Sequence, residues 1–267
     1  MEYKDLTFKV ISLAKTVAEF IKTESSKFRH VDIEEKGQHN YVTYVDKGSE
    51  RLLVEGLSLL IPESGFIAEE GTSSKIGSIY NWVIDPLDGT TNFIHGVPIF
   101  SISIALTEYD EVVVGVVLEV TSGECFYAWK DGGAYLNGEK IRVSERNNVA
   151  DTLLATGFPY YDYSLMDSYL KLLKHFIQNT RGLRRLGSAA VDLAWVACGR
   201  FDAFYEYGLN PWDVAAGAFI VEQAGGKSTD FKGIKSGING NRILSSNGLL
   251  HDDYLCIINQ FFESEKD

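Results

Sequence analysis

Apolar residues recur at helical spacing in the first quarter of the chain. Between residues 5 and 27 they return every three or four positions, and residues 46–60 show the same pattern before Pro62. This period predicts two amphipathic helices, the second of which ends near the proline. The apolar positions of the first helix are Leu6, Val10, Leu13, Ala14, Val17 and Ile21.

Strand patterns dominate the middle of the chain. Residues 65–70 and 80–85 are short apolar runs that each end in acidic residues, and residues 99–143 contain β-rich segments separated by turn signals. These patterns predict two strands followed by an antiparallel meander. Further on, strands are predicted at 153–158, 202–207 and 242–245, and helices at 163–178, 188–198, 210–223 and 250–262. This order predicts an α+β protein built of layered sheets and helices.

Composition narrows the class of protein. The 267 residues suffice for a single domain with two closely packed subdomains, about 1–145 and 146–267. The three widely spaced cysteines favour a reducing compartment, so we expect a cytoplasmic protein. The chain shows neither a membrane-length apolar run nor the pattern of a secretory signal. The net charge of −12 argues against nucleic acid as the main partner.

Acidic residues stand where three predicted elements begin or end. Glu69 and Glu70 close one strand, Asp85 and Asp88 follow the next, and Asp213 lies in the first turn of a later helix. Oxygen atoms of carboxylates and carbonyls are the ligands that hard cations such as Mg²⁺ prefer. The three segments together therefore predict a metal centre.

The segment that follows Asp85 adds features of a phosphate site. The proline turn can aim the Leu87 carbonyl at the same point as the acids, and Gly89, Thr90 and Thr91 can offer backbone N–H groups at a helix start. Carboxylates alone would repel a phosphate, so a cation must lie between them. The combination predicts phosphate chemistry assisted by more than one metal ion.

Simpler interpretations exist for each segment taken alone. A single D-P-x-D sequence is usually only a turn, and Asp213 could complement the helix dipole. The basic run at 181–187 could contact a polyanion, although a solvated loop or a subunit contact is the more common explanation. The stretch at 225–229 lacks the first glycine of a P-loop, because Val221 occupies that position, so a helix end followed by a strand is predicted.

Three motifs resemble the inositol monophosphatase family of Mg²⁺-dependent, lithium-sensitive phosphatases. They are FIAEE at 66–70, DPLDGTTNF at 85–93 and NPWDVAAGAFIVEQAGG at 210–226, in the family's order. The resemblance extends over nearly the whole chain. It implies a layered αβαβα sandwich of the inositol monophosphatase/fructose-1,6-bisphosphatase type, two to three Mg²⁺ ions and a homodimer.

The resemblance also implies the metal ligands. Glu69, Asp85 and the Leu87 carbonyl match the ligands of a first metal, and Asp85, Asp88 and Asp213 match those of a second. Glu69 would help to hold a weaker third ion. Many members have an acid where this chain has Asn40. This difference bears on how the loop closes or on the affinity for the third ion.

Catalytic and substrate-binding roles follow from the same resemblance. Thr90 matches the residue that orients the attacking water, with Asp46 as its acidic partner and Glu69 in support. Lys36 falls in a basic loop near the site. The residues expected to contact the substrate are Asp88, Gly89, Thr90, Thr91 and Asp213 near the phosphate, and Ser188, Ala189 and Glu206 near the alcohol.

The expected reaction is hydrolysis of myo-inositol monophosphate, or a similar polyol phosphate, to the free alcohol and inorganic phosphate. Two relatives of the same superfamily remain as alternatives, a fructose-1,6-bisphosphatase and a 3′-phosphoadenosine nucleotidase. Thr91-Asn92-Phe93 stands where nucleotidases typically carry a Lys-Glu pair, which favours the inositol branch. A third alternative is a binding role on RNA or a transcription complex.

Overall fold

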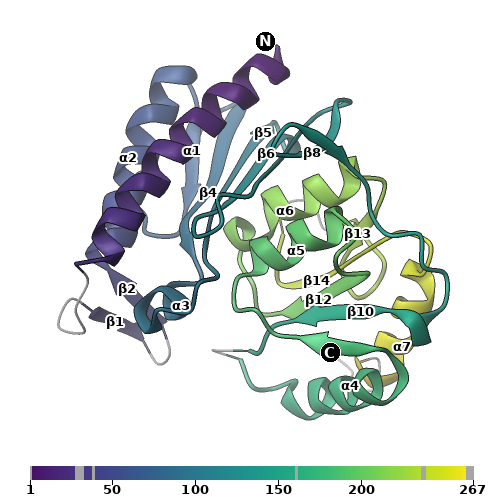
Figure 1. Cartoon of the computed structure of the whole chain (residues 1–267). Coiled ribbons are helices and arrows are strands. Elements are labelled where there is room, and N and C mark those ends of the chain that lie inside the picture. The colour runs from purple at the N-terminus through teal and green to yellow at the C-terminus, as the bar shows by residue number, and fades with distance from the viewer. Residues whose placement is uncertain (1, 28–32, 38–39, 160–161, 236–238, 263–267) are drawn as a thin grey trace.

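The structure is a computed structural model that describes residues 2–27, 33–37, 40–159, 162–235 and 239–262. Its helices and sheets alternate in five layers (Figure 1). This arrangement confirms the layered αβαβα sandwich that the family resemblance implies. Among the described helices, none is both long and apolar enough to cross a membrane.

The first two layers are a helix pair and a seven-stranded sheet. Helices α1 (Tyr3–Ser25) and α2 (Tyr44–Leu60) cover one face of the sheet (Figure 1). Burial of Val10, Val17 and Leu53 between the helices and the sheet explains the helical period in the sequence. The sheet runs in the order β3 (Gly65–Ala68), β4 (Tyr80–Asp88), β5 (Ser101–Glu108), β6 (Glu111–Glu119), β7 (Cys125–Trp129), β8 (Gly133–Leu136) and β9 (Glu139–Ile141).

The middle layer consists of α5 (Ala189–Ala197) and α6 (Pro211–Gln223), between the two sheets (Figure 1). These helices are apolar on nearly all sides because both of their faces are covered. The second sheet has the order β11 (Gly182–Arg184), β10 (Leu153–Thr156), β12 (Ala203–Tyr207), β14 (Arg242–Ser246) and β13 (Lys227–Thr229). Helices α4 (Met166–Asn179) and α7 (His251–Phe262) form the last layer.

The structure adds local elements that the hydrophobic pattern does not reveal. A short hairpin of β1 (Ile33–Gly37) and β2 (Asn40–Thr43) precedes α2, and the six-residue helix α3 (Thr90–His95) follows β4. Helix α2 begins at Tyr44, two residues before the predicted start, because Thr43 caps it. The strand predicted to end at residue 85 continues through an irregular pairing to Asp88.

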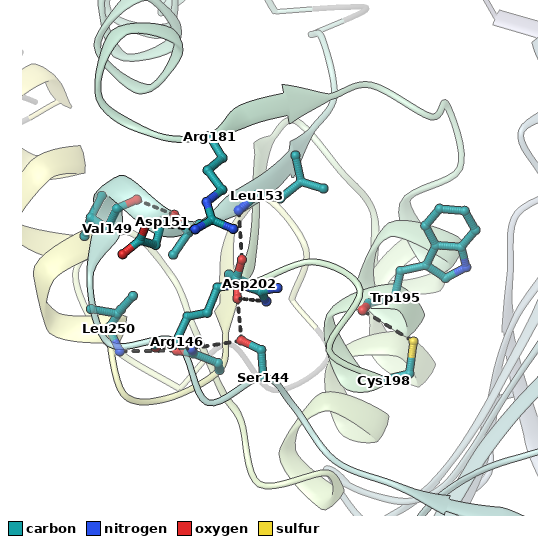
Figure 2. A network of polar contacts seen from close by, with 12 residues as sticks. Ser144, Arg146, Val149, Asp151, Leu153, Arg181, Trp195, Cys198, Asp202 and Leu250 are labelled. Carbon is teal, nitrogen blue, oxygen red and sulfur yellow. Dashed lines mark hydrogen bonds and ion pairs between the residues drawn. The ribbon is translucent and has the colours of Figure 1, made fainter.

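A polar network around the buried Asp202 fixes the chain segment that connects the two sheets (Figure 2). The fully buried Asp202 accepts hydrogen bonds from the Ser144 hydroxyl, from Arg146 Nη1 at 3.0 Å and from the Leu153 backbone N–H at 2.8 Å. The 3₁₀ turn η2 (Val149–Asp151) lies on the same connection. The network therefore joins this connection to the starts of β10 and β12. The division into two subdomains near residue 145 stays a prediction.

Candidate active site: a buried carboxylate centre

Three carboxylates from distant parts of the chain meet at one point. Asp85, Asp88 and Asp213 each offer an oxygen, and these atoms all lie within 4.8 Å of one another. Asp85 pairs with Ser103 across β4 and β5, and the Ser103 hydroxyl donates to the Trp212 carbonyl at 3.0 Å. This bond ties the start of α6, and with it Asp213, to the end of β4.

The end of β4 is shaped to present its acids. Its pairing with β5 shifts register between Asp85 and Asp88, and Pro86 lies within the irregularity. A bulge of this kind bends a strand and redirects its side chains, and it tolerates a proline that regular pairing would exclude. The Leu87 backbone N–H donates to Asp85 Oδ1 at 2.9 Å, which holds the turn closed.

Each acid has one oxygen occupied by hydrogen bonds. Asp88 Oδ2 accepts from the Ser188 hydroxyl at 2.5 Å and from the Ala190 N–H at 2.8 Å. Asp213 Oδ2 accepts from the Asn210 N–H at 2.7 Å. Such bonds orient a carboxylate and leave its other oxygen available to a cation.

Glu69 approaches the centre from β3. Its negative charge is among the causes that raise the pKa of Asp85, after burial itself. The loop that carries Glu69 is held by the fully buried Glu50 of α2, which accepts from the Glu70 N–H and the Thr72 N–H, both at 2.7 Å. Glu50 is thus a supporting residue that the sequence motifs do not single out.

Electrostatics in the centre are unfavourable without a counter-charge. Burial and the neighbouring acids raise the pKa of Asp85 well above its ordinary value, and burial together with Asp88 raises the pKa of Asp213 to about 7. Like charges in a desolvated site cannot all ionise unless a cation joins them. The all-oxygen donor set of these groups suits a hard divalent ion.

A threonine–aspartate pair borders the carboxylates. The Thr90 hydroxyl lies 3.0 Å from Asp46 Oδ1 and 3.1 Å from the Leu87 carbonyl oxygen. Asp46 Oδ2 accepts from Thr43 twice, from its N–H at 2.8 Å and from its hydroxyl at 2.5 Å. Burial raises the pKa of Asp46, and these hydrogen bonds oppose the rise.

The cavity beside this centre has a volume of about 140 Å³. Gly89 lies on its wall in a left-handed conformation, with φ of 96°. A Cβ atom there would lie 3.1 Å from the carbonyl oxygens of Gly187 and Ile99, so only glycine lets the backbone approach so closely. The lining residues are Glu69, Asp88, Gly89, Thr90, Thr91, Gly157, Arg185, Gly187, Ser188, Ala189, Asp192, Glu206, Gly208, Leu209, Asn210 and Asp213.

The model of the inositol monophosphatase family matches residues 2–261 of the chain. The chain belongs to this family. It is 42% identical over 239 residues to "Nus factor SuhB" of Pseudomonas aeruginosa, with 88% of each chain covered. It is 40% identical over 233 residues to "Fructose-1,6-bisphosphatase/inositol-1-monophosphatase" of Thermotoga maritima, covering 87% of this chain and 88% of the relative.

The fold is also similar to that of a solved structure. The fold matches the suhB extragenic suppressor protein of Bartonella henselae with a TM-score of 0.91 and 33% identity, over 96% of this chain and 99% of the other. As a member of the inositol monophosphatase family, the protein is a phosphoric monoester hydrolase, which confirms the predicted class of enzyme. The family is metal-dependent, in agreement with the acidic centre.

The structure brings most of the predicted residues to one cavity of this family member. The Asp85, Asp88 and Asp213 cluster borders it, and the Thr90–Asp46 pair lies beside the cluster. Thr91, Ser188, Ala189 and Glu206 line the cavity. Lys36 falls on β1, but its side chain lies outside the described part of the structure. The individual catalytic and binding roles stay predictions.

Two charged residues of the cavity were not expected there. Arg185 belongs to the basic run for which the sequence favours a solvated loop or a subunit contact, yet it lines the cavity with its guanidinium 5.4 Å from the centre of the Phe158 ring. Asp192 lies on the otherwise apolar helix α5. A single acid within an otherwise apolar helix is the sequence feature that could have identified Asp192 as a functional residue.

Proposed function

We propose that the protein hydrolyses myo-inositol monophosphate, or a similar polyol phosphate, with two to three Mg²⁺ ions. The observation that carries this proposal is the placement of the Asp85, Asp88 and Asp213 cluster beside the Thr90–Asp46 pair. Glu69, Asp85, Asp88, Asp213 and the Leu87 carbonyl would hold the ions. When bound, the ions would neutralise the ester phosphate and lower the pKa of water.

The protein's own residues would orient the attacking water. A water hydrogen-bonded to Thr90 Oγ1 can pass its proton toward Asp46 through the hydroxyl, because Thr90 and Asp46 Oδ1 are 3.0 Å apart. Thr43 fixes the far oxygen of Asp46 and thereby the direction of transfer. The backbone amides of Gly89 and Thr90, with Thr91 beside them, would hold the phosphate at the start of α3.

The same cavity would receive the alcohol. Glu206, Ser188 and Ala189 are among its lining residues, and the buried Glu206 carboxyl can accept a hydrogen bond from a substrate hydroxyl. This geometry supports a polyol monophosphate among the phosphate esters considered.

A role in RNA or transcription-complex binding receives less support from the described surface. Arg181 pairs with Asp151 at 3.0 Å, and Arg185 faces the cavity, so the basic run at 181–187 is not a continuous basic patch. The chain also carries a net charge of −12. The term "Nus factor" belongs to the name of the Pseudomonas relative and does not by itself assign that role to this protein.

The remaining proposals concern the setting of the enzyme. By family resemblance we propose a homodimer and inhibition by lithium. The free cysteines Cys125, Cys198 and Cys256 fit a reducing cytoplasm.

The substrate is tested by phosphate release with and without Mg²⁺. The panel contains inositol 1-phosphate, fructose 1,6-bisphosphate and 3′-phosphoadenosine 5′-phosphate. We expect Mg²⁺-dependent release with the highest kcat/KM for inositol 1-phosphate. A higher kcat/KM for either other ester would move the substrate assignment, and no release from any ester would reject it.

A further inference from the structure

Asp192 is an acidic side chain buried in an apolar helix. It is the one charged residue in the α5 sequence AAVDLAWVA, and it is 1% exposed. Its Oδ1 atom has no hydrogen-bond partner within the described residues, although the residue lines the substrate cavity. A buried carboxyl oxygen without a partner is costly, and such groups usually await a ligand or water.

The position of Asp192 in the first turn of α5 does not account for it. The helix dipole favours an acid there only modestly. Ser188 already caps the helix, because its hydroxyl accepts from the Val191 N–H at 3.3 Å. A serine or an alanine at 192 would continue the apolar helix without burying a charge.

Two charged neighbours share the cavity wall with Asp192. Glu206 is 6% exposed on β12, and Arg185 is another lining residue of the same cavity. Burial raises the pKa of Asp192 well above its ordinary value, the charges of Glu206 and Asp88 raise it further, and the Arg185 charge opposes the rise. A Cβ atom on Gly157 would lie 2.0 Å from Glu206 Oε2, so the backbone at Gly157 packs directly against that carboxyl.

The balance of charge in this part of the cavity distinguishes between esters. Metal ions would neutralise Glu69, Asp85, Asp88 and Asp213, whereas Asp192 and Glu206 line the same cavity with Arg185 as the one cationic side chain of its lining. The carboxyl oxygens of Asp192 and Glu206, in a pocket with one arginine, can accept hydrogen bonds from neutral hydroxyl groups. A second phosphate on the leaving alcohol would bring further negative charge beside two buried carboxyl groups, which disfavours its binding there.

We propose that Asp192 is a specificity-determining residue that, with Glu206 and Arg185, forms a subsite for the hydroxyl groups of an uncharged polyol and disfavours esters with a second phosphate. This inference rests on the proposed phosphatase function. It adds two residues, Asp192 and Arg185, to the alcohol pocket expected from the sequence.

The test is the isosteric substitution Asp192→Asn in the full-length protein. Values of kcat and KM are measured for inositol 1-phosphate, for fructose 1,6-bisphosphate and for 4-nitrophenyl phosphate, which lacks hydroxyl groups to bind. We expect the ratio of kcat/KM for inositol 1-phosphate over fructose 1,6-bisphosphate to fall about 10-fold or more, mainly through KM, as uniform binding is lost. The kcat/KM for 4-nitrophenyl phosphate should change less than threefold.

Stability separates this role from a structural one. If the carboxylate serves the substrate, Asp192→Asn should leave the thermal midpoint unchanged or raise it, because a buried charge is removed. Asp192→Ala is a second variant in case the amide is not tolerated, and Asp253→Asn on the exposed face of α7 is the matched control. Failure of both Asp192 variants to fold would show a structural role and overturn the proposal.

The outcomes also separate this inference from the function on which it rests. A wild-type protein that hydrolyses none of the three esters with Mg²⁺ would reject the proposed function and the inference together. An active wild type with an unchanged selectivity ratio in Asp192→Asn would reject the inference alone.

Discussion

The Thr90 hydroxyl at the start of α3 donates to Asp46 Oδ1 on α2 over 3.0 Å. These residues are 44 positions apart, yet the bond spans the edge of the carboxylate centre. It joins the helix that follows β4 to the helix layer behind the sheet. This bond is the basis of the proposed transfer of a proton from the attacking water to Asp46.

Substitution of this pair should lower the rate of hydrolysis without loss of the fold. Thr90→Ala removes the hydroxyl, and Asp46→Asn removes the proton acceptor. Each change should reduce kcat for inositol 1-phosphate by about 10²- to 10⁴-fold, the usual contribution of general acid–base groups. Steady-state kinetics and a circular-dichroism spectrum check this, with Thr90→Ser as the control that keeps most activity. Near-normal kcat in Thr90→Ala would remove Thr90 from the mechanism.

Glu50 should control metal affinity from a distance. Its carboxylate accepts from the Glu70 and Thr72 N–H groups and so fixes the loop that carries Glu69. Glu50→Ala should raise the Mg²⁺ concentration for half-maximal activity about 10- to 100-fold, the range for groups that orient metal ligands. A Mg²⁺ titration of activity measures the effect, and the exposed Glu55→Ala on the same helix is the control. Equal Mg²⁺ requirements in Glu50→Ala and wild type would contradict the role.

His251 should make stability depend on pH in the acidic range. The buried imidazole contacts the Thr229 hydroxyl at 2.9 Å and the Ser246 hydroxyl at 2.8 Å, and burial lowers its pKa to about 4. Between pH 6.5 and 4 the unfolded chain binds a proton at this residue that the folded protein excludes. The unfolding free energy should therefore fall as pH decreases, by as much as ~1.4 kcal/mol per pH unit from this residue.

Urea denaturation of wild type and His251→Gln at pH 4.5 to 7.5 measures that contribution. The glutamine can keep hydrogen bonds to both hydroxyls but does not titrate. The variant should lose stability less steeply below pH 6.5. Parallel pH profiles for the two proteins would show that His251 is not the group responsible.

The Asp202 network should support the fold rather than the chemistry (Figure 2). Asp202→Asn weakens three hydrogen bonds to a buried carboxylate and should reduce the unfolding free energy by about 2 kcal/mol. Asp151→Asn, which removes an exposed ion pair with Arg181 in the same region, should cost less than about 1 kcal/mol. Urea denaturation gives both values. If Asp202→Asn instead raised the Mg²⁺ requirement at unchanged stability, the network would belong to the site.

The sequence is sufficient to predict the layers and the acidic centre. The helical period of residues 5–27 and the alternation of strands and helices after 153 follow directly from which faces are buried. The acids of the centre could be predicted because each stands at the end of an element, where a side chain can leave the core.

Other features depend on contacts between distant segments. The irregular end of β4 is set by the pairing with β5, which a local period does not reveal. Arg185 could not be assigned to the cavity, because an arginine in a basic run has the pattern of a solvated loop. Glu50 shows no local signal, since its partners lie 20 and 22 residues away.

The central claim is that Asp85, Asp88 and Asp213 hold catalytic metal ions. The most direct measurement is phosphate release from inositol 1-phosphate over a Mg²⁺ titration, for wild type, Asp88→Asn and the exposed control Asp253→Asn. We predict Mg²⁺-dependent release by wild type and by the control, and a loss of at least two orders of magnitude in kcat/KM in folded Asp88→Asn. Wild-type turnover in Asp88→Asn, or release that does not depend on Mg²⁺, would contradict the claim.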